Sequence, residues 1–366
     1  MKFSIERDLL LKPLQSLCGV VEKRQTLPIL SNLLVKVEKD KLFLTSTDLE
    51  VEMHTSISVK GTDPGETSFS ARKFLDICRT LPEGALIDVS KEASKVTIKS
   101  GKSRFSLTTL DPSEFPSVDA VEQGISFSIA QNTFRRLIEK TQFAMAQQDV
   151  RYYLNGLMLE LSQKGLRCVA TDGHRLAMCD GDVEIRTPEI KQVIVPRKAI
   201  IELGRLLDTT DDEIRVDVGT NHIHTVFGET TFTSKLIDGR FPDYQRVVPQ
   251  GGNKIVIADK ELLKQSLTRV SILSNEKYRG VRFTVSDGLL QVQAHNPDQE
   301  EAEEELSVDY TGGDLEIGFN VTYFIDVLNV IPTDKVQIVL LDSSSSCLIQ
   351  EPGNEDCKYV VMPMRL

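Results

Sequence analysis

The feature that most constrains the fold of this 366-residue chain is an internal repeat. A short alternating strand that runs into a helix occurs three times, beginning at Phe3, Phe127 and Ile255. Two β-rich segments follow each helix, and the second ends in a polar turn. These turns are 124 residues apart, at Thr47-Asp48, Thr171-Asp172 and His295-Asn296. A period held across the whole chain indicates tandem copies of one structural unit.

Each third of the chain contains a second strand-helix unit, beginning near Ser68, Val193 and Leu315. We therefore predict three tandem similar domains, each of two strand-helix-sheet halves, with boundaries at 1–121, 122–248 and 249–366. Two helices packed on sheet in every domain correspond to the α+β class. Apolar residues at helical spacing predict one helix in each of six windows: 8–24, 71–82, 131–148, 196–208, 259–276 and 320–331.

Cysteine usage and apolar runs limit the cellular setting. The apolar runs fall far short of the roughly 18–20 residues that a membrane helix needs. The first residues alternate apolar and polar side chains and lack the apolar region of a secretory signal. We therefore expect a cytoplasmic protein with no membrane partner. Six cysteines without a C-x-x-C or metal-ligand spacing are expected to be reduced thiols with no disulfide framework: Cys18, Cys78, Cys168, Cys179, Cys347 and Cys357.

The charge is distributed unevenly between the helices and the rest of the chain. The net charge of −11 argues, taken alone, against a DNA-binding protein. The six helix windows, however, contain fifteen Lys or Arg against ten Asp or Glu, a net charge of +5. Mildly basic helices in an acidic protein suit passage along DNA without tight binding. Solvated helix faces are also commonly rich in lysine, so charge alone does not decide between these interpretations.

Catalytic and metal-binding motifs are missing from the sequence. There is no P-loop, no G-x-G-x-x-G after a strand, no H-E-x-x-H and no G-x-S-x-G. His222 and His224 would lie on one face of a strand, but no nearby ligand completes a metal site. The acidic run 298–305 lacks the pattern of an EF-hand loop and is expected to be solvated or to lie at an interface. The motifs therefore give no sign of an enzyme or of a metal site.

Several long motifs resemble those of the bacterial beta sliding clamp family, the beta subunit of DNA polymerase III. They cover the chain from end to end, in the order expected from the repeat: Thr26-Leu27-Pro28-Ile29-Leu30, residues 148–156 (QDVRYYLNG), 170–177 (ATDGHRLA), 238–244 (DGRFPDY), Ser274-Asn275-Glu276-Lys277 and the terminal 359–366 (YVVMPMRL).

The resemblance implies the DNA clamp fold: a head-to-tail homodimer that forms a ring, with helices lining the hole and sheets outside. It implies a processivity factor that encircles duplex DNA without reading its sequence, in a cytoplasmic, nucleoid-associated setting. A clamp loader would place it on DNA, and polymerases and repair proteins would dock through short linear motifs. The resemblance implies that the clamp itself is not an enzyme and needs no cofactor. The implied DNA contacts are Arg24, Gln148, Arg151, Tyr153, Arg197, Lys198 and Arg246.

The resemblance also implies a peptide-binding pocket and a dimer interface. The tail residues Met362 and Met364 suit such a pocket, because flexible methionines adapt to many partners, although they could equally complete the core of the last strand. The implied pocket residues are Leu154, Thr171, Gly173, His174, Arg175, Leu176, Pro242, Arg246, Val247, Tyr323, Ser346, Val360, Val361, Met362, Pro363, Met364, Arg365 and Leu366. The implied dimer contacts join Lys73, Ile77, Lys102, Arg104, Phe105 and Leu107 to Ile272, Leu273, Glu300, Glu301, Glu303 and Glu304.

Two alternative hypotheses about the function remain open on the sequence alone. The first is an enzyme with an unrecognised site around Asp172, His174 and Arg175, which a turnover assay with His174→Ala would test. The second is a protein-binding scaffold that never meets DNA, which failure to be retained on circular DNA would favour.

Overall fold

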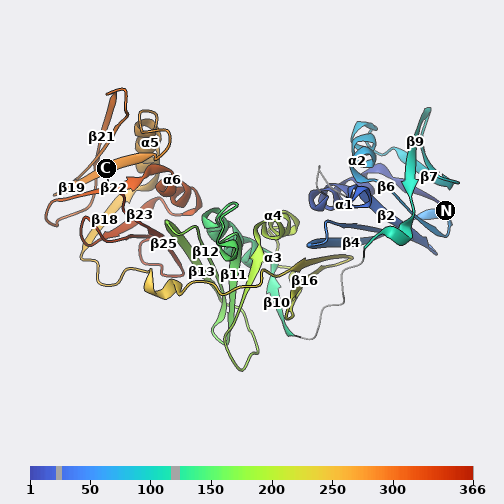
Figure 1. Cartoon of the computed structure of the whole chain (residues 1–366), viewed down its shortest axis with the longest axis horizontal. Helices are drawn as coiled ribbons and strands as arrows, with labels where there is room; N and C mark the ends of the chain where they lie inside the picture. Colours follow the sequence, from blue (N-terminus) through green and yellow to red (C-terminus); the bar gives the residue numbers. More distant parts are fainter. Residues whose placement is uncertain (22–26, 117–123, 366) are drawn as a thin grey trace. The chain divides into compact units, whose positions relative to one another are not determined.

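The computed structural model describes residues 1–21, 27–116 and 124–365. These residues form two compact units, each assembled from two separate stretches of the chain. Unit one contains residues 1–132 and 198–236, and unit two contains residues 133–197 and 237–366. Figure 1 gives the course of the chain.

Unit one is built on a single 13-stranded antiparallel sheet. Its strand order is β10-β15-β16-β17-β4-β3-β2-β6-β9-β8-β7-β1-β5. The strands are β1 (Lys2–Glu6), β2 (Asn32–Glu38), β3 (Lys41–Thr47), β4 (Val51–Ser58), β5 (Lys60–Asp63), β6 (Gly65–Ser70), β7 (Leu86–Glu92), β8 (Lys95–Ser100), β9 (Ser103–Leu110), β10 (Ile125–Ala130), β15 (Glu213–Val218), β16 (His222–Phe227) and β17 (Thr230–Lys235).

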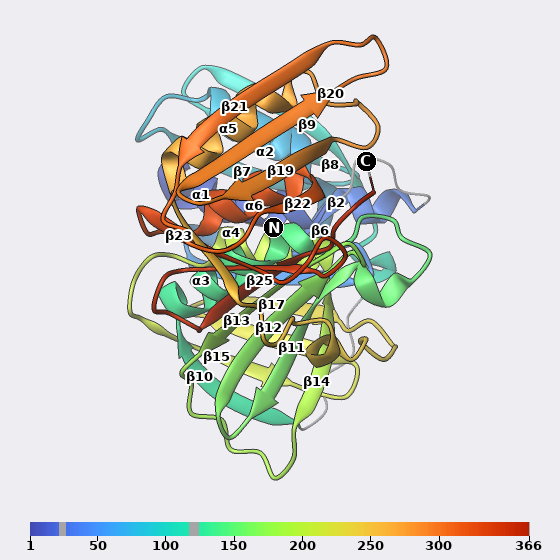
Figure 2. The same ribbon diagram turned by 90° about the vertical axis from the view of Figure 1, so that its left-hand side faces the viewer.

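Unit two contains an eight-stranded sheet of order β14-β11-β12-β13-β25-β24-β23-β18 and a four-stranded sheet of order β21-β20-β19-β22. Figure 2 shows the dark red β25 running beside the green β13, in agreement with their antiparallel pairing. The strands are β11 (Gly156–Ser162), β12 (Gly165–Thr171), β13 (Arg175–Gly181), β14 (Lys191–Pro196), β18 (Lys254–Asp259), β19 (Gly280–Ser286), β20 (Leu289–His295), β21 (Glu301–Ser307), β22 (Leu315–Asn320), β23 (Lys335–Leu340), β24 (Cys347–Gln350) and β25 (Cys357–Val361).

One α-helix lies in each predicted window, and its apolar side packs on sheet. Helix α1 contacts α2, β3 and β4, and α5 contacts α6, β20 and β21. Side-chain oxygens of Ser70, Asp259 and Asn320 cap the starts of α2, α5 and α6, as expected for these residue types. The helices are α1 (Arg7–Val20), α2 (Ala71–Thr80), α3 (Gln131–Thr141), α4 (Arg197–Leu206), α5 (Lys260–Ser271) and α6 (Val321–Val330).

The prediction of a helix through residue 148 is wrong, because α3 ends at Thr141. The Thr141 hydroxyl donates to the Leu137 carbonyl oxygen at 2.7 Å, and the chain tightens into a 3-10 turn over Gln142–Ala144. Met145 is then extended, at φ −62° and ψ 137°, so the helical pattern stops there. The window 259–276 was also too long, because α5 ends at Ser271 and Ile272 already forms its C-cap.

The strands divide into six groups of four, two in each predicted domain, with β5 added at one edge. The middle domain is shared between the units: β11 to β14 join the sheet of unit two, whereas β10 and β15 to β17 join the sheet of unit one. Two strand pairs therefore connect neighbouring domains. We call β4–β17 the first junction and β13–β25 the second junction.

In the described parts of the chain, no helix is long and apolar enough to cross a membrane.

Candidate functional site

The polar turn that leads into β13 is held by its own side chains. The Thr171 hydroxyl donates to the Arg175 carbonyl oxygen at 2.6 Å and accepts from the Gly173 amide at 3.1 Å. The Asp172 carboxylate accepts from the amides of His174 and Arg175 at 2.9 and 3.1 Å. Gly173 has φ +89°, a left-handed conformation that glycine adopts without a steric penalty. These contacts fix the start of β13, where most of the predicted pocket residues of the middle domain lie.

Several of the predicted pocket residues lie together in one apolar cluster. Leu154, Leu176 and Val360 are each at most 2% exposed and belong to a single cluster with Phe241, and the partly buried Val247 packs against it. The other predicted pocket residues of this region stand at or near the surface: Gly173, Tyr323 and Ser346 are half-buried, and His174, Pro242 and Arg246 are exposed. Buried aliphatic groups beneath a polar turn can hold an apolar peptide side chain while nearby polar groups set its orientation.

The tail continues from β25 along unit two. The Met362 amide donates to the His174 carbonyl oxygen, and the Met364 amide donates to the Gly318 carbonyl oxygen, both at 2.9 Å. Val361 is buried, Met362, Pro363 and Met364 are half-buried, and Arg365 is exposed; Leu366 lies outside the described residues. The methionines of the tail are therefore partly accessible and do not lie wholly within the core.

A polar hollow of about 320 Å³ adjoins this turn and is lined by His174, Arg175, Asp172, Asp149 and Arg197, among others. The Asp172 carboxylate is occupied by the turn amides and by the Arg175 guanidinium, whose Nε donates to it at 3.0 Å. A carboxylate held in this way lacks the free lone pairs that a general base needs. The arrangement favours a binding surface over the alternative of an active site around Asp172, His174 and Arg175.

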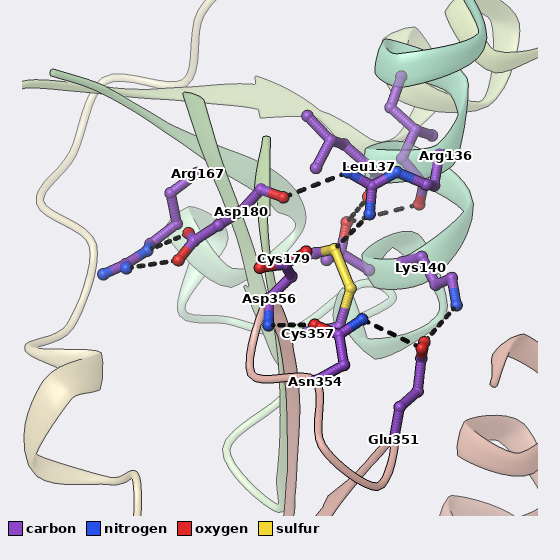
Figure 3. Close-up of a disulfide and its surroundings, with 12 residues drawn as sticks. Arg136, Leu137, Lys140, Arg167, Cys179, Asp180, Glu351, Asn354, Asp356 and Cys357 are labelled. Atoms are coloured by element: carbon purple, nitrogen blue, oxygen red, sulfur yellow. Dashed lines mark hydrogen bonds and ion pairs between the residues drawn. A yellow bond between two sulfur atoms is a disulfide. The ribbon is translucent and has the colours of Figure 1, made fainter. Parts of the chain in front are cut away.

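The prediction that all six cysteines are reduced is wrong for two of them. Cys179 of β13 and Cys357 of β25 stand directly opposite each other in the second junction and form a disulfide, with a Cα–Cα distance of 4.1 Å. Figure 3 shows this bond beside Arg136, which approaches the Cys179 Sγ at 3.7 Å. The buried ion pair between Lys140 and Glu351 lies next to it, at 3.1 Å. Sequence spacing could not reveal this disulfide, because 178 residues separate its two cysteines.

The predicted DNA contacts of the loop 147–153 lie close to the polar hollow. Gln148 is exposed and has φ +56°. The Arg151 guanidinium donates to both oxygens of Asp149 at 3.0 and 2.8 Å, and this hydrogen bonding lowers the pKa of Asp149 to about 2. Tyr153 is half-buried, with its ring 5.9 Å from that of Tyr152.

Three of the other predicted DNA contacts have partners within the chain. Arg197 donates to the Met145 carbonyl oxygen at 2.9 Å. Lys198 donates to the Val20 carbonyl oxygen at 2.8 Å and forms an ion pair with Asp48. The largely exposed Arg246 pairs with Asp243 at 2.8 Å. Arg24 lies outside the described residues.

The predicted dimer residues lie on two strand edges and the helices beside them. Strand β9 pairs with β8 over Ser103–Thr108, and in the described chain its opposite edge pairs only at Thr109 and Leu110, with β6. Strand β21 ends the four-stranded sheet and pairs only with β20 among the described strands. Phe105 and Leu107 alternate as the half-buried positions of β9, between exposed neighbours that include Arg104; Lys73 and Lys102 are exposed and Ile77 half-buried.

On the β21 side, Ile272 is 75% exposed and Leu273 is half-buried. The acids there have local partners. Arg269 donates to both oxygens of Glu304 at 2.6 and 2.8 Å, and these hydrogen bonds lower the pKa of Glu304 to about 2. Glu303 accepts from Gln291 and Gln293, Glu300 accepts from Asn296, and Glu301 is exposed.

No group of three His, Cys, Asp or Glu side chains in residues 1–21, 27–116 and 124–365 is placed to hold a metal ion. His222 and His224 therefore have no such partners there, and the His224 imidazole instead hydrogen-bonds Thr233 at 2.8 Å.

Comparison with known proteins shows to which family the chain belongs. Three family models of the DNA polymerase III beta subunit match in chain order: the N-terminal domain over residues 1–119, the central domain over 128–243 and the C-terminal domain over 245–365. The chain belongs to the DNA polymerase III beta subunit family. The beta sliding clamps of Pseudomonas aeruginosa and Escherichia coli are 56% and 52% identical to it, with all of each chain covered.

Solved clamps agree with the fold. The beta subunit of Pseudomonas aeruginosa superposes with a TM-score of 0.96 at 56% identity, and the same clamp bound to griselimycin gives 0.97, with both chains fully covered in each case. The family confirms the three tandem clamp domains and the interpretation as a sliding clamp, a non-catalytic processivity factor in DNA replication.

Proposed function

We propose that two copies of this sliding clamp close head to tail around duplex DNA and bind replication and repair proteins through the pocket beside the second junction. The observation that best supports this proposal is the pair of open strand edges on β9 and β21. Each junction within the chain joins the last strand of one half-domain to the corresponding strand of the next domain. Among the final strands of the described half-domains, β21 and β9 are the two that no junction within the chain uses. Two identical chains that paired β21 with β9 would make a third junction twice.

The intrachain junctions also predict the register of this third junction. Thr55 stands opposite Thr230, and Cys179 stands opposite Cys357. The hairpin β8–β9 pairs Ser100 with Ser103 in the way that β16–β17 pairs Phe227 with Thr230, so Ser103 takes the place of Thr230 and Cys357.

The turn before β21 is one residue longer than the turn before β13. Its flanking strands pair His295 with Glu301, whereas Thr171 pairs with Leu176. Glu304 therefore takes the place of Cys179 and should stand opposite Ser103 of the second copy. Lys102 is then opposite Glu305, and Arg104 opposite Glu303. Opposite charges across antiparallel strands favour this register.

A cross-link tests the register and the ring together. Ser103→Cys combined with Glu304→Cys should form two disulfides per dimer under mild oxidation, whereas Ser103→Cys with Glu303→Cys should cross-link poorly, because side chains alternate between faces of a strand. The cross-linked ring, once loaded on nicked circular DNA, should stay on it in denaturing detergent and leave when the circle is cut. A cross-linked dimer that detergent removes from intact circles would contradict encirclement.

The apolar part of the interface should also be necessary. Ile272 and Leu273 are expected to meet Ile77, Phe105 and Leu107 of the second copy. Burial of each Leu or Ile contributes about 1.5–3 kcal/mol, so Ile272→Ala with Leu273→Ala should yield monomers at low concentration. A variant that stays fully dimeric in sedimentation would show that this interface is misassigned.

DNA is held by topology in this proposal, and direct contacts are weak. Arg24, Gln148, Arg151, Tyr153, Arg197, Lys198 and Arg246 would touch phosphate and sugar, since contacts to base edges would hinder movement over any sequence. Direct affinity should therefore fall steeply with salt, by a slope of about 0.9 for each phosphate contact. Retention on closed circles should not fall with salt in this way. A clamp that left closed circles at the salt concentration that abolishes direct binding would favour contact over encirclement.

Truncation of the C-terminal tail tests the docking pocket. Deletion of residues 362–366 should abolish binding of the replicative polymerase, the clamp loader and griselimycin, while the dimer survives. Equal affinity of the truncated protein for these ligands would rule out the pocket. We also infer a cytoplasmic, nucleoid-associated location, which fluorescence microscopy of a tagged clamp would test.

A further inference from the structure

Arg175, the first residue of β13, is held from three directions inside unit two. Its Nε donates to Asp172 at 3.0 Å, its Nη2 donates to the Phe143 carbonyl oxygen at 2.9 Å, and its Nη1 donates to Asp326. Asp326 belongs to α6, in the third domain. The guanidinium carbon also lies 4.6 Å from the centre of the Tyr323 ring. All three nitrogens of the guanidinium therefore have a protein partner.

This arrangement changes what Arg175 can offer to a ligand. Its side chain is only 13% exposed, and the two carboxylates paired with it outnumber its single positive charge. Each guanidinium nitrogen already has one partner, and the two carboxylates beside it would repel a ligand carboxylate, so the site gains little from binding an anion. Its planar group lies close to two aromatic rings, 4.6 Å from the centre of Tyr323 and 5.4 Å from that of Phe143, so the surface around it is largely apolar. The wall that it forms suits an uncharged or apolar side chain.

We propose that Asp326 is a positioning residue for the docking pocket: it holds the Arg175 guanidinium against Tyr323 across the domain boundary, and so shapes a wall that selects uncharged peptide side chains. This inference rests on the proposed docking function. Asp326 acts through Arg175 and needs no contact with the ligand. The first junction has no equivalent, since Val51 occupies the position of Arg175 in β4.

A double-mutant cycle measures whether Asp326 acts through Arg175. Griselimycin, with which the Pseudomonas aeruginosa clamp was crystallised, serves as the probe in titration calorimetry on the full-length protein. Asp326→Ala should weaken binding about tenfold, and Arg175→Ala by at least as much. In the Arg175→Ala background, Asp326→Ala should change affinity by less than about twofold, because the interaction that it supports is already gone.

Two further variants separate positioning from a loss of folding. Asp326→Glu keeps the carboxylate and should bind within about twofold of the wild type. Asp314→Asn removes an exposed carboxylate elsewhere in the third domain and should have no effect. Thermal unfolding of every variant identifies any that are misfolded.

The possible results distinguish the inference from the docking function itself. Additive losses in the cycle, or unchanged affinity in Asp326→Ala, would overturn the positioning role while leaving the pocket intact. Failure of the wild type to bind both griselimycin and the polymerase would instead overturn the docking function on which the inference rests.

Discussion

The two junctions within the chain share one backbone design and differ in side-chain chemistry. In each, five antiparallel pairs join the edge strands of neighbouring domains. At the first junction, the hydroxyl groups of Thr55 and Thr230 are 2.8 Å apart and form a hydrogen bond. At the corresponding place in the second junction, Cys179 and Cys357 form a disulfide.

The ion pairs near the two junctions differ in burial, and again the second junction has the more buried contact. Lys41 and Glu229 at the first junction are 50% and 67% exposed, whereas Lys140 and Glu351 at the second are 11% and 10% exposed. The second junction thus depends on buried and covalent contacts, and the proposed docking pocket lies beside it. Identical strand pairing therefore does not determine how firmly two domains are joined; a few side chains that cross the pairing do.

The largest expected difference comes from the ion pairs. Lys140→Ala leaves Glu351 buried, and among the described side chains Asn354 is then its remaining hydrogen-bond donor, at 3.2 Å. Loss of one member of a buried pair costs about 3–5 kcal/mol, so the free energy of unfolding of unit two, measured with urea, should fall by that amount. Lys41→Ala at the first junction should cost less than about 1 kcal/mol.

A control for that prediction replaces both buried charges. Lys140→Met with Glu351→Leu should recover most of the lost stability, since no unpaired charge remains. Equal losses for Lys140→Ala and Lys41→Ala would show that burial does not separate the two junctions.

The disulfide gives the next largest effect. Cys179→Thr with Cys357→Thr copies the first junction into the second and should lower the free energy of unfolding by about 2–4 kcal/mol under oxidising conditions. Reductant should destabilise the wild type by a similar amount and leave the variant unchanged. The reciprocal pair, Thr55→Cys with Thr230→Cys, should make unit one sensitive to reductant. A wild type with the same stability with and without reductant would show that the thiols are not joined in solution.

A smaller effect is expected from the threonine pair. Thr55→Val leaves the hydroxyl of Thr230 without this partner and should cost about 0.5–1.5 kcal/mol. Thr55→Val with Thr230→Val should be nearly neutral, because both polar groups are then removed, and Thr55→Ser should keep the bond. If single and double valine variants lose the same stability, the hydrogen bond is not what joins the strands there.

The smallest effect is a pH dependence confined to unit one. Burial lowers the pKa of His54 in β4 and of His224 in β16. The unfolded chain then binds protons that the folded chain excludes, so stability is full above about pH 6.5 and falls as the pH drops below it. Urea unfolding between pH 7.5 and 5.5 should show this loss in unit one, and His54→Gln with His224→Gln should reduce it. His295→Gln, at an exposed position, is the control.

The sequence predicted the parts of the fold that local patterns encode. Leu10, Leu14 and Leu17 recur at helical spacing and are all fully buried in α1. The repeat predicted three tandem domains, because each copy repeats the same order of strands and helices. It could not predict that the strands of the middle domain join two different sheets, because pairing between edges depends on contacts far apart in the sequence.

The candidate sites show the same limit. The motif around Arg175 indicated a pocket through family resemblance, and Leu154, Leu176 and Val360 do share one cluster. Its attachment to Asp326 joins residues 151 positions apart, and no spacing rule encodes that distance. The disulfide was missed for the same reason. The individual DNA, pocket and dimer contacts and the domain boundaries remain predictions.

The two units are interleaved along the chain, and this has a consequence for synthesis. Residues 133–197 leave the ribosome between the two parts of unit one, and at about 5–20 residues per second β4 waits roughly 10–40 s for β17. During that time β4 presents an open edge to other nascent chains. The repeated domains suggest that one domain could be exchanged for another. A cut at either domain boundary, however, would leave an unpaired strand edge on both fragments. Although one module is repeated along the sequence, the chain folds as two units whose segments alternate along it.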